Sequence, residues 1–272
     1  MTRRRPSSPS ARGGPRKRPS KKAPARGRRT VRGPGAPRPP ITVVLFDLDD
    51  TLYDCFGQRV LAAHRNASRA LAAAGLPASA EEIMKLRLAA LEADPRLEFI
   101  DTEVCRRLGM GYDDSIRETA QAAYFSTPVG RLRLFPGAQR LLRYLKRRGV
   151  RNFIVSFGDP DTQRAKVAAL RLDREPAVEN IFYADRDQVL TKQEVFRSIL
   201  RTAESDPARV LVVGDRPASE IREGNELGMY TVRLRHGEFA ALEPEGEAER
   251  ADHEIKRITD LRKLPFQFGP PH

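Results

Sequence analysis

Four aspartates, Asp47, Asp49, Asp50 and Asp54, stand close together in the segment ITVVLFDLDDTLYD, residues 41–54. They follow a run of mostly β-branched or large apolar residues, which predicts a buried strand that ends at a common rim. Carboxylates crowded at one rim repel one another, so a compensating cation is expected there. A hard cation such as Mg²⁺ suits oxygen ligands of this kind. Aspartate also ends strands and begins turns, so this segment alone leaves a turn as the alternative.

Two later segments also place a polar residue after an apolar run. Ser156 ends the run NFIVS and precedes Phe157 and Gly158. A hydroxyl at a strand end can donate to a phosphoryl oxygen, and glycine lets backbone N–H groups approach the same group. Lys192 opens a helical pattern in LTKQEVF, where a cation is unfavourable at the positive end of the helix dipole unless an anion lies nearby. A turn serine and a solvated surface lysine are the ordinary alternatives.

The segment VLVVGDRPASEI is the most specific of these segments. Asp215 follows an apolar run and a glycine, and Glu220 comes five residues later. Asp215 can complete an oxygen-rich Mg²⁺ site, and Glu220 can hold metal-bound water or orient a lysine. Each segment alone is weak, but all four in this order indicate one site for phosphate chemistry.

The elements that must position these residues alternate along the chain from residue 41. Apolar strands alternate with amphipathic helices, which predicts an α/β fold with a doubly wound parallel sheet. The expected strands are residues 43–46, 152–156, 181–184, 210–213 and 231–234, and the expected helices are residues 136–148, 161–170, 192–204 and 218–227. Ligands of open α/β sheets bind beyond the carboxyl ends of the strands, where the candidate residues fall.

Helical periodicity replaces this alternation between residues 55 and 134, which predicts an inserted helical cap domain. Ser79 and Glu82 have the spacing of a capping box, and further helices are expected over residues 60–74, 100–108 and 113–125. A cap that leaves from the end of the first strand would exclude water and select substrates. Five residues of the cap are candidates for contact with a leaving group: His64, Arg65, Arg87, Arg96 and Tyr112. Each of them also suits a surface or packing position.

The net charge of +13 is carried by the first 40 residues, which hold 11 Arg, 3 Lys and no acidic residue. The remainder of the chain therefore sums to −1. The same segment contains nine of the 21 prolines, so we expect a disordered basic tail. It could bind RNA, DNA or another polyanion, although it lacks aromatic residues on which bases stack. A dispensable extension and, less well supported, an organelle transit peptide are the alternatives.

Composition bounds the remaining properties. No apolar run approaches 18 residues, so no membrane span is expected, and the basic start is not followed by the apolar segment of a secretory signal. Cys55 and Cys105 lack the spacing of a zinc site, which favours a reducing, cytoplasmic location. We expect a core of residues 41–54 and 135–264, a solvated extension over residues 243–263, and a tail of residues 265–272. Oligomeric state is not indicated.

Taken together, the four segments resemble the motifs of the haloacid dehalogenase-like (HAD) superfamily, of the type with a helical cap inserted after the first motif. The resemblance covers residues 41 to about 240, and DLDDTLYD is its most diagnostic part. It implies an Mg²⁺-dependent phosphatase that hydrolyses small phosphorylated metabolites through an aspartyl-phosphate.

The resemblance also implies roles for the charged residues. Asp47 matches the nucleophile, Asp49 the general acid and base, and Lys192 the lysine of the third motif. Asp47, Asp49 and Asp215 would ligate Mg²⁺, with Glu220 in support. Asp49 argues against a dehalogenase, because a departing halide needs no proton.

Phosphate contacts are implied for Thr51, which also fixes the turn after the nucleophile, and for Ser156, Phe157 and Gly158. Two positions depart from the family pattern. Phe157 stands where many relatives have Asn, and Gln193 stands where Pro commonly follows the lysine. These departures put the phosphate contact after Ser156 in question.

Three alternatives stay open from the sequence. Lys166 in the QRAKVAAL helix is a rival for the cationic role, although Lys192 is favoured. A phosphomutase acting on a sugar phosphate would use the same pair of aspartates. A nucleic-acid-associated phosphatase would use the basic tail for binding.

Overall fold

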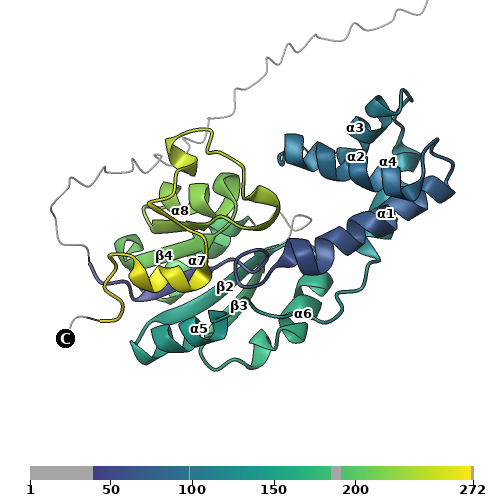
Figure 1. Ribbon diagram of the computed structural model, residues 1–272. Coiled ribbons are helices and arrows are strands. Elements are labelled where there is room, and N and C mark those ends of the chain that lie inside the picture. The colour runs from purple at the N-terminus through teal and green to yellow at the C-terminus, as the bar shows by residue number, and fades with distance from the viewer. Residues whose placement is uncertain (1–38, 98, 185–190, 271–272) are drawn as a thin grey trace, which may run out of the picture.

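Six strands form one parallel sheet in the order β3-β2-β1-β4-β5-β6 (Figure 1). The computed structural model describes residues 39–97, 99–184 and 191–270, so the tail predicted for residues 1–40 lies almost wholly outside the described residues. The strands are β1 (Val43–Phe46), β2 (Arg151–Phe157), β3 (Asn180–Ala184), β4 (Val210–Gly214), β5 (Tyr230–Leu234) and β6 (His253–Ile255). The predicted α/β fold with a parallel sheet is confirmed.

Helices cover both faces of the sheet. They are α5 (Ala138–Arg147), α6 (Pro160–Ala169), α7 (Lys192–Thr202) and the short α8 (Arg222–Glu226). Val44 and Phe46 of β1 belong to a core that includes residues of α5 and α6. Val43 and Leu45 belong to a second core that includes residues of α7. Successive side chains of a strand point to opposite faces, so a strand buried on both faces must be continuously apolar, as β1 is.

The insert after β1 folds into helices that Figure 1 shows as a separate lobe at the upper right. It begins with a π-helical turn, η1 (Phe56–Val60), and continues with α1 (Leu61–Ala73), α2 (Ala80–Ala93), α3 (Ile100–Arg107) and α4 (Asp114–Phe125). The Ser79 side chain and Glu82 form the predicted capping box of α2. Leu71, Ile83 and Val104 help to form a core of its own for this lobe. We call α1–α4 the cap.

Both connections of the cap leave from the same place on the core. Tyr53, before the cap, pairs with Leu134, after it, in an antiparallel bridge. The Phe135 N–H donates to the Leu52 carbonyl at 2.9 Å in the same junction. The chain therefore passes from β1 into the cap and back into the core beside the carboxyl end of β1.

The C-terminal part differs from the prediction. Residues 243–263, expected to be a solvated extension, include β6, which pairs with β5, and the 3₁₀ segment η7 (Ile258–Lys263), whose Ile258 and Leu261 are buried. Phe268, in the expected tail, bridges to Ile41 at the start of β1. The strand was missed because its three residues, HEI, are too short and polar for an apolar pattern.

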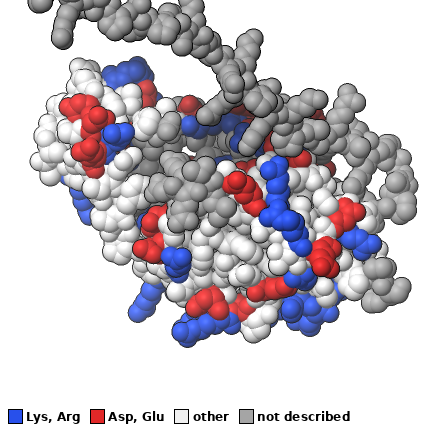
Figure 2. Space-filling view, turned by 180° about the vertical axis from the view of Figure 1, so that it is seen from behind, with Lys and Arg blue, Asp and Glu red and all other residues white. Residues whose placement is uncertain are grey.

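Acidic and basic side chains are intermixed on the face of the molecule that Figure 2 shows. Within the described chain many of them pair, as Arg151 does with Glu179 at 2.5 Å and Arg143 with Glu175 at 2.9 Å. Where described residues are visible on this face, they form no continuous basic surface of the kind that binds nucleic acid. Across the described ranges, no helix is long and apolar enough to span a membrane.

Candidate active site

Lys192 connects two of the predicted acidic residues. Asp47 directly follows β1. Its backbone N–H donates to the Val213 carbonyl of β4 at 2.9 Å, which fixes Asp47 at the carboxyl ends of the strands. Lys192 is the first residue of α7, and its Nζ donates to Asp47 Oδ1 and to Glu220 Oε1. All three side chains are buried. The cation that is unfavourable at this helix start is thus balanced by two carboxylates from other elements.

One lysine does not balance all the acidic groups around it. Burial raises the pKa of Asp47 to about 7 against the attraction of Lys192, and Glu220 and Asp49 raise it further. Burial, then Glu220 and Asp47, raise the pKa of Asp215 well above its ordinary value. Burial would also raise the pKa of Glu220, but Lys192 and Arg216 outweigh it and lower the pKa. This group of carboxylates therefore has a deficit of positive charge.

Asp49 has a separate set of partners. The Lys166 Nζ donates to Asp49 Oδ2 at 2.6 Å, and the Tyr53 hydroxyl donates to Asp49 Oδ1 at 2.7 Å. Gln163 Nε2 adds a longer bond to Asp49 Oδ2 at 3.3 Å. Burial alone would raise the pKa of Asp49, but Lys166 and these hydrogen bonds lower it. Asp49 is therefore held in its ionised form.

Lys166 belongs to the site together with Lys192, so the two lysines are not alternatives. Lys166 holds Asp49, and Lys192 holds Asp47. The partners Tyr53 and Gln163 were missed from the sequence. Gln163 and Lys166 are three residues apart in the helix after Ser156, and that spacing, which puts them on one helical face, was a usable signal.

The loop after β2 carries the predicted phosphate contacts. Ser156 is 1% exposed near the end of β2. The Phe157 carbonyl accepts a hydrogen bond from Gln163 Nε2 at 3.0 Å. Gly158 has φ 143°, and a Cβ there would lie 2.7 Å from the same nitrogen, so the close approach of this loop to Gln163 requires glycine. Thr51 Oγ1 is buried without a hydrogen-bond partner in the described part of the chain.

Glu220 lies in a second π-helical turn, η4 (Pro217–Ile221), which follows Asp215. The Arg216 N–H donates to Glu220 Oε2 at 3.3 Å. A Cβ at Gly214 would lie 2.8 Å from Glu220 Cγ, so this glycine makes room for the glutamate. Arg233 Nε donates to the Asp215 carbonyl at 3.2 Å and fixes the backbone after β4.

The side chains of the predicted ligands suit a divalent cation. Asp47, Asp49 and Asp215 offer only oxygen atoms. Burial first, and neighbouring carboxylates in addition, raise the pKa values of Asp47 and Asp215. Among the described residues, Asp50, Asp54 and His236 form a group of three whose possible ligand atoms all lie within 4.8 Å of one another. Lys192 Nζ contacts one oxygen of Asp47, and Lys166 Nζ contacts one oxygen of Asp49.

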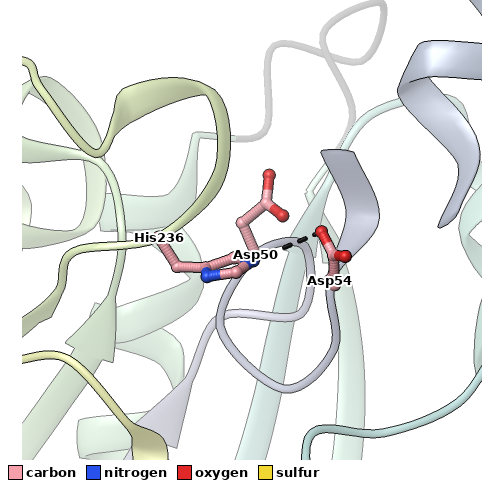
Figure 3. Close-up of side chains that lie close together, drawn as sticks. All are labelled: Asp50, Asp54 and His236. Atoms are coloured by element: carbon pink, nitrogen blue, oxygen red, sulfur yellow. Dashed lines mark hydrogen bonds and ion pairs between the residues drawn. The ribbon is translucent and has the colours of Figure 1, made fainter. Parts of the chain in front are cut away.

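Figure 3 shows Asp50, Asp54 and His236 close together. His236 Nε2 lies 3.2 Å from Asp54 Oδ1, and the His236 ring packs edge-on against Phe135. Asp50 has φ 52° and accepts the Phe56 N–H at 3.0 Å. These contacts tie the loop after β1 to the segment after β5 and to the entry of the cap.

A cavity of about 170 Å³ lies between the cap and the core. It is lined by His64, Arg87, Phe99, Ile100, Asp101, Tyr112, Arg117, Ala120, Gln121, Tyr124, Phe125 and Glu238. Glu238, from the 3₁₀ turn η5 (Gly237–Phe239) of the core, was missed from the sequence. Of the other cap candidates, Arg65 is exposed, and Arg96 pairs with Glu249 of the core at 2.8 Å. His64, Arg87 and Tyr112 line the cavity.

The sheet and the residues at its carboxyl edge define a class of protein. The haloacid dehalogenase-like hydrolase family matches residues 41–228, and the chain belongs to that family. The predicted family and the enzyme class, a hydrolase, are confirmed. Members of this family generally use a divalent metal ion.

Two curated relatives are glyceraldehyde 3-phosphate phosphatases of archaea. The protein of Pyrococcus abyssi is 33% identical over 82% of this chain and 93% of its own length. That of Pyrococcus furiosus is 30% identical over 82% of this chain and 92% of its own length. Solved structures share the fold. A predicted phosphoglycolate phosphatase of Haemophilus somnus has a TM-score of 0.60 at 17% identity, over 82% of this chain and 97% of that one. The magnesium-bound HAD hydrolase YfnB of Bacillus subtilis has a TM-score of 0.56 at 19% identity, over 82% of this chain and 98% of that one.

Proposed function

We propose that the protein is an Mg²⁺-dependent phosphatase that hydrolyses a small phosphorylated metabolite through an aspartyl-phosphate on Asp47. The arrangement that carries the proposal is the separate holding of the two aspartates, Asp47 by Lys192 and Asp49 by Lys166. Such a pair provides a nucleophile and a proton-transfer group next to each other. The relatives favour a three-carbon sugar phosphate, glyceraldehyde 3-phosphate, as substrate.

In the first half-reaction, the Asp47 carboxylate attacks phosphorus in line with the departing alkoxide. Lys192 holds Asp47 and stabilises negative charge on the phosphoryl oxygens. A phosphoryl dianion bound beside Asp49 raises the pKa of that carboxyl, so Asp49 takes up a proton from solvent and transfers it to the departing alkoxide. When bound by Asp47, Asp49 and Asp215, Mg²⁺ would neutralise further charge on the phosphoryl group.

In the second half-reaction, Asp49 takes a proton from the water that hydrolyses the aspartyl-phosphate. The lowered pKa of Asp49 suits this step, since an ionised carboxylate is the form that accepts a proton. Arg96 ties the cap to Glu249 of the core, and a cap closed over the site would limit access of other nucleophiles.

The test replaces Asp47 in the full chain. We expect Asp47→Asn to lower kcat on glyceraldehyde 3-phosphate at least about 10³-fold, because the amide is no nucleophile. Asp173→Asn, at an exposed position, is the matched control and should keep wild-type turnover. Phosphate release is measured with Mg²⁺ and after chelation, across a panel of sugar phosphates, phosphoglycolate and nucleoside monophosphates. Near wild-type hydrolysis by Asp47→Asn would refute the mechanism, and formation of an isomer without phosphate release would indicate a phosphomutase.

The free, buried thiols of Cys55 and Cys105 support our further proposal that the enzyme works in a reducing, cytoplasmic compartment.

A further inference from the structure

Arg59 is a buried cation without hydrogen-bond partners for two of its nitrogens. It lies in the π-helical turn η1, between the loop after β1 and the cap, and is 5% exposed. Within the described chain, Arg59 Nε and Nη2 have no hydrogen-bond partner. A guanidinium does not lose its proton in a protein, so it cannot relieve this cost by becoming neutral. Buried N–H groups of a cation that lack hydrogen-bond partners are destabilising, so their presence calls for a function.

The Nε and Nη2 atoms of Arg59, which we call its fork, are the atoms that other arginines of this protein use to bind carboxylates. Arg143 donates from Nε at 3.0 Å and from Nη2 at 2.9 Å to Glu175. Arg151 donates from the same two atoms to Glu179, at 2.9 and 2.5 Å. Two parallel N–H groups match the two oxygens of a carboxylate or phosphate. In Arg59 this fork is buried and unused.

The surroundings of Arg59 place it between the phosphate loop and the cap cavity. The pKa of Asp159, directly after Gly158, is lowered first by hydrogen bonds from Thr162 and in part by Arg59. Burial raises the pKa of Tyr124, which lines the cavity, and Arg59 opposes that shift. The turn η1 also packs against η5, which carries Glu238 of the cavity wall. A substrate with its phosphoryl group at the sheet edge would pass this point.

We propose that Arg59 is a substrate-binding residue whose Nε–Nη2 fork binds an oxyanion of the phosphorylated substrate. This inference rests on the proposed function and names a further determinant of it. The oxyanion is either the phosphoryl group itself or a carboxylate or second phosphate of the leaving group. Because folding has already removed the water around Arg59, binding does not incur that cost again, and the fork is preorganised.

The experiment compares Arg59→Met, which removes charge and fork, with Arg59→Lys, which keeps only the charge. Arg69→Gln, at an exposed position of α1, is the matched control. For Arg59→Met we expect a ten- to hundredfold rise in KM, about the effect of losing a charged hydrogen bond, with a smaller change in kcat. The unfolding temperature of the ligand-free protein should stay equal or rise, because an unpaired buried cation is gone. Arg59→Lys should fall between wild type and Arg59→Met.

Two binding measurements identify the oxyanion. Weaker calorimetric binding of inorganic phosphate, with KM raised alike for all esters, assigns the fork to the phosphoryl group. Unchanged phosphate binding, with KM raised only for a phosphorylated hydroxy acid and not for an uncharged leaving group, assigns it to the leaving group. If Arg59→Met keeps the wild-type KM and the wild-type affinity for inorganic phosphate, the proposal is overturned. A lowered unfolding temperature with unchanged binding also overturns it. Loss of the proposed function would differ, since wild type itself would then release no phosphate.

Discussion

At the scale of single residues, the site depends on how two lysines share its carboxylates. Lys166 serves Asp49, while Lys192 serves both Asp47 and Glu220. Burial raises the pKa of both aspartates. Lys166 and the Tyr53 hydrogen bond outweigh burial at Asp49 and lower its pKa, whereas Lys192 does not outweigh burial at Asp47, whose pKa stays raised. The two aspartates thereby acquire different proton affinities, which a reaction needing a nucleophile and a separate acid and base requires.

Removal of the Lys192 charge should affect both turnover and stability. In Lys192→Met, Asp47 and Glu220 lose their shared partner inside the protein, so we expect a loss of about 3–5 kcal/mol in the free energy of unfolding. Turnover should fall about 10²- to 10³-fold, as for the loss of one group that stabilises transition-state charge. Urea unfolding and phosphate release measure the two effects.

A double variant separates these effects. Lys192→Met with Glu220→Gln leaves fewer unpaired buried charges, so stability should partly return while activity does not. Lys263→Met, which removes an exposed lysine paired with Asp260, serves as the control. Unchanged stability of the single variant would show that the buried pairs contribute no net free energy.

At the scale of elements, a buried polar network joins three helices of the cap. Arg87 of α2 pairs with Asp101 of α3 and donates from Nε to His64 Nδ1 of α1 at 3.3 Å. Tyr124 of α4 packs edge-on against His64, with ring centroids 5.2 Å apart. Burial and the adjacent Arg87 lower the pKa of His64 to about 4. The network therefore requires a neutral His64.

This network predicts loss of stability in mild acid. The unfolded chain takes up a proton on His64 as the pH falls through 6.5, whereas the folded protein does so only near pH 4. Between these values the unfolded state binds more protons, so stability falls with falling pH, by up to about 3 kcal/mol. Asp101 has a raised pKa and acts in the opposite direction, so the contribution of His64 must be isolated by substitution.

His64→Gln should therefore show a weaker loss of stability than wild type between pH 7 and pH 4.5. The measurement is the unfolding temperature of both proteins across this range. Arg69→Gln, at an exposed position of the same helix, should follow the wild-type curve. Parallel curves for wild type and His64→Gln would rule out the assigned pKa shift.

At the scale of the whole molecule, the positive charge and the site are in different parts of the chain. The residues after position 40 are nearly neutral in sum, and every residue assigned to the site follows position 41. Deletion of residues 1–38 should therefore leave kcat/KM on small esters unchanged. It should abolish any binding of polyanions that weakens with salt, because that binding depends on Lys and Arg.

Titration of a labelled oligonucleotide at low and high salt, with phosphate release in parallel, checks this expectation. A lowered rate on small esters after the deletion would make the basic segment part of the catalytic unit. Equal oligonucleotide binding with and without it would exclude its use as a nucleic-acid arm.

Local patterns made much of this structure predictable from the sequence. Continuous apolar runs indicated strands buried on both faces, and a capping box placed the start of α2, because both signals depend on neighbours within a few residues. Asp47, Ser156 and Asp215 could be placed at strand ends for the same reason. Strand β6 was not predicted because a short polar edge strand has no continuous apolar run.

What the sequence by itself determined, then, is the parallel sheet, the helical insert and the set of side chains at the strand ends. Only the tertiary structure decided that Lys166 pairs with Asp49 across 117 positions, that Glu238 faces the cap cavity and that the fork of Arg59 is left free. The physical reason is that pairing and desolvation depend on distances between residues far apart in the chain, which packing sets and local periodicity does not record.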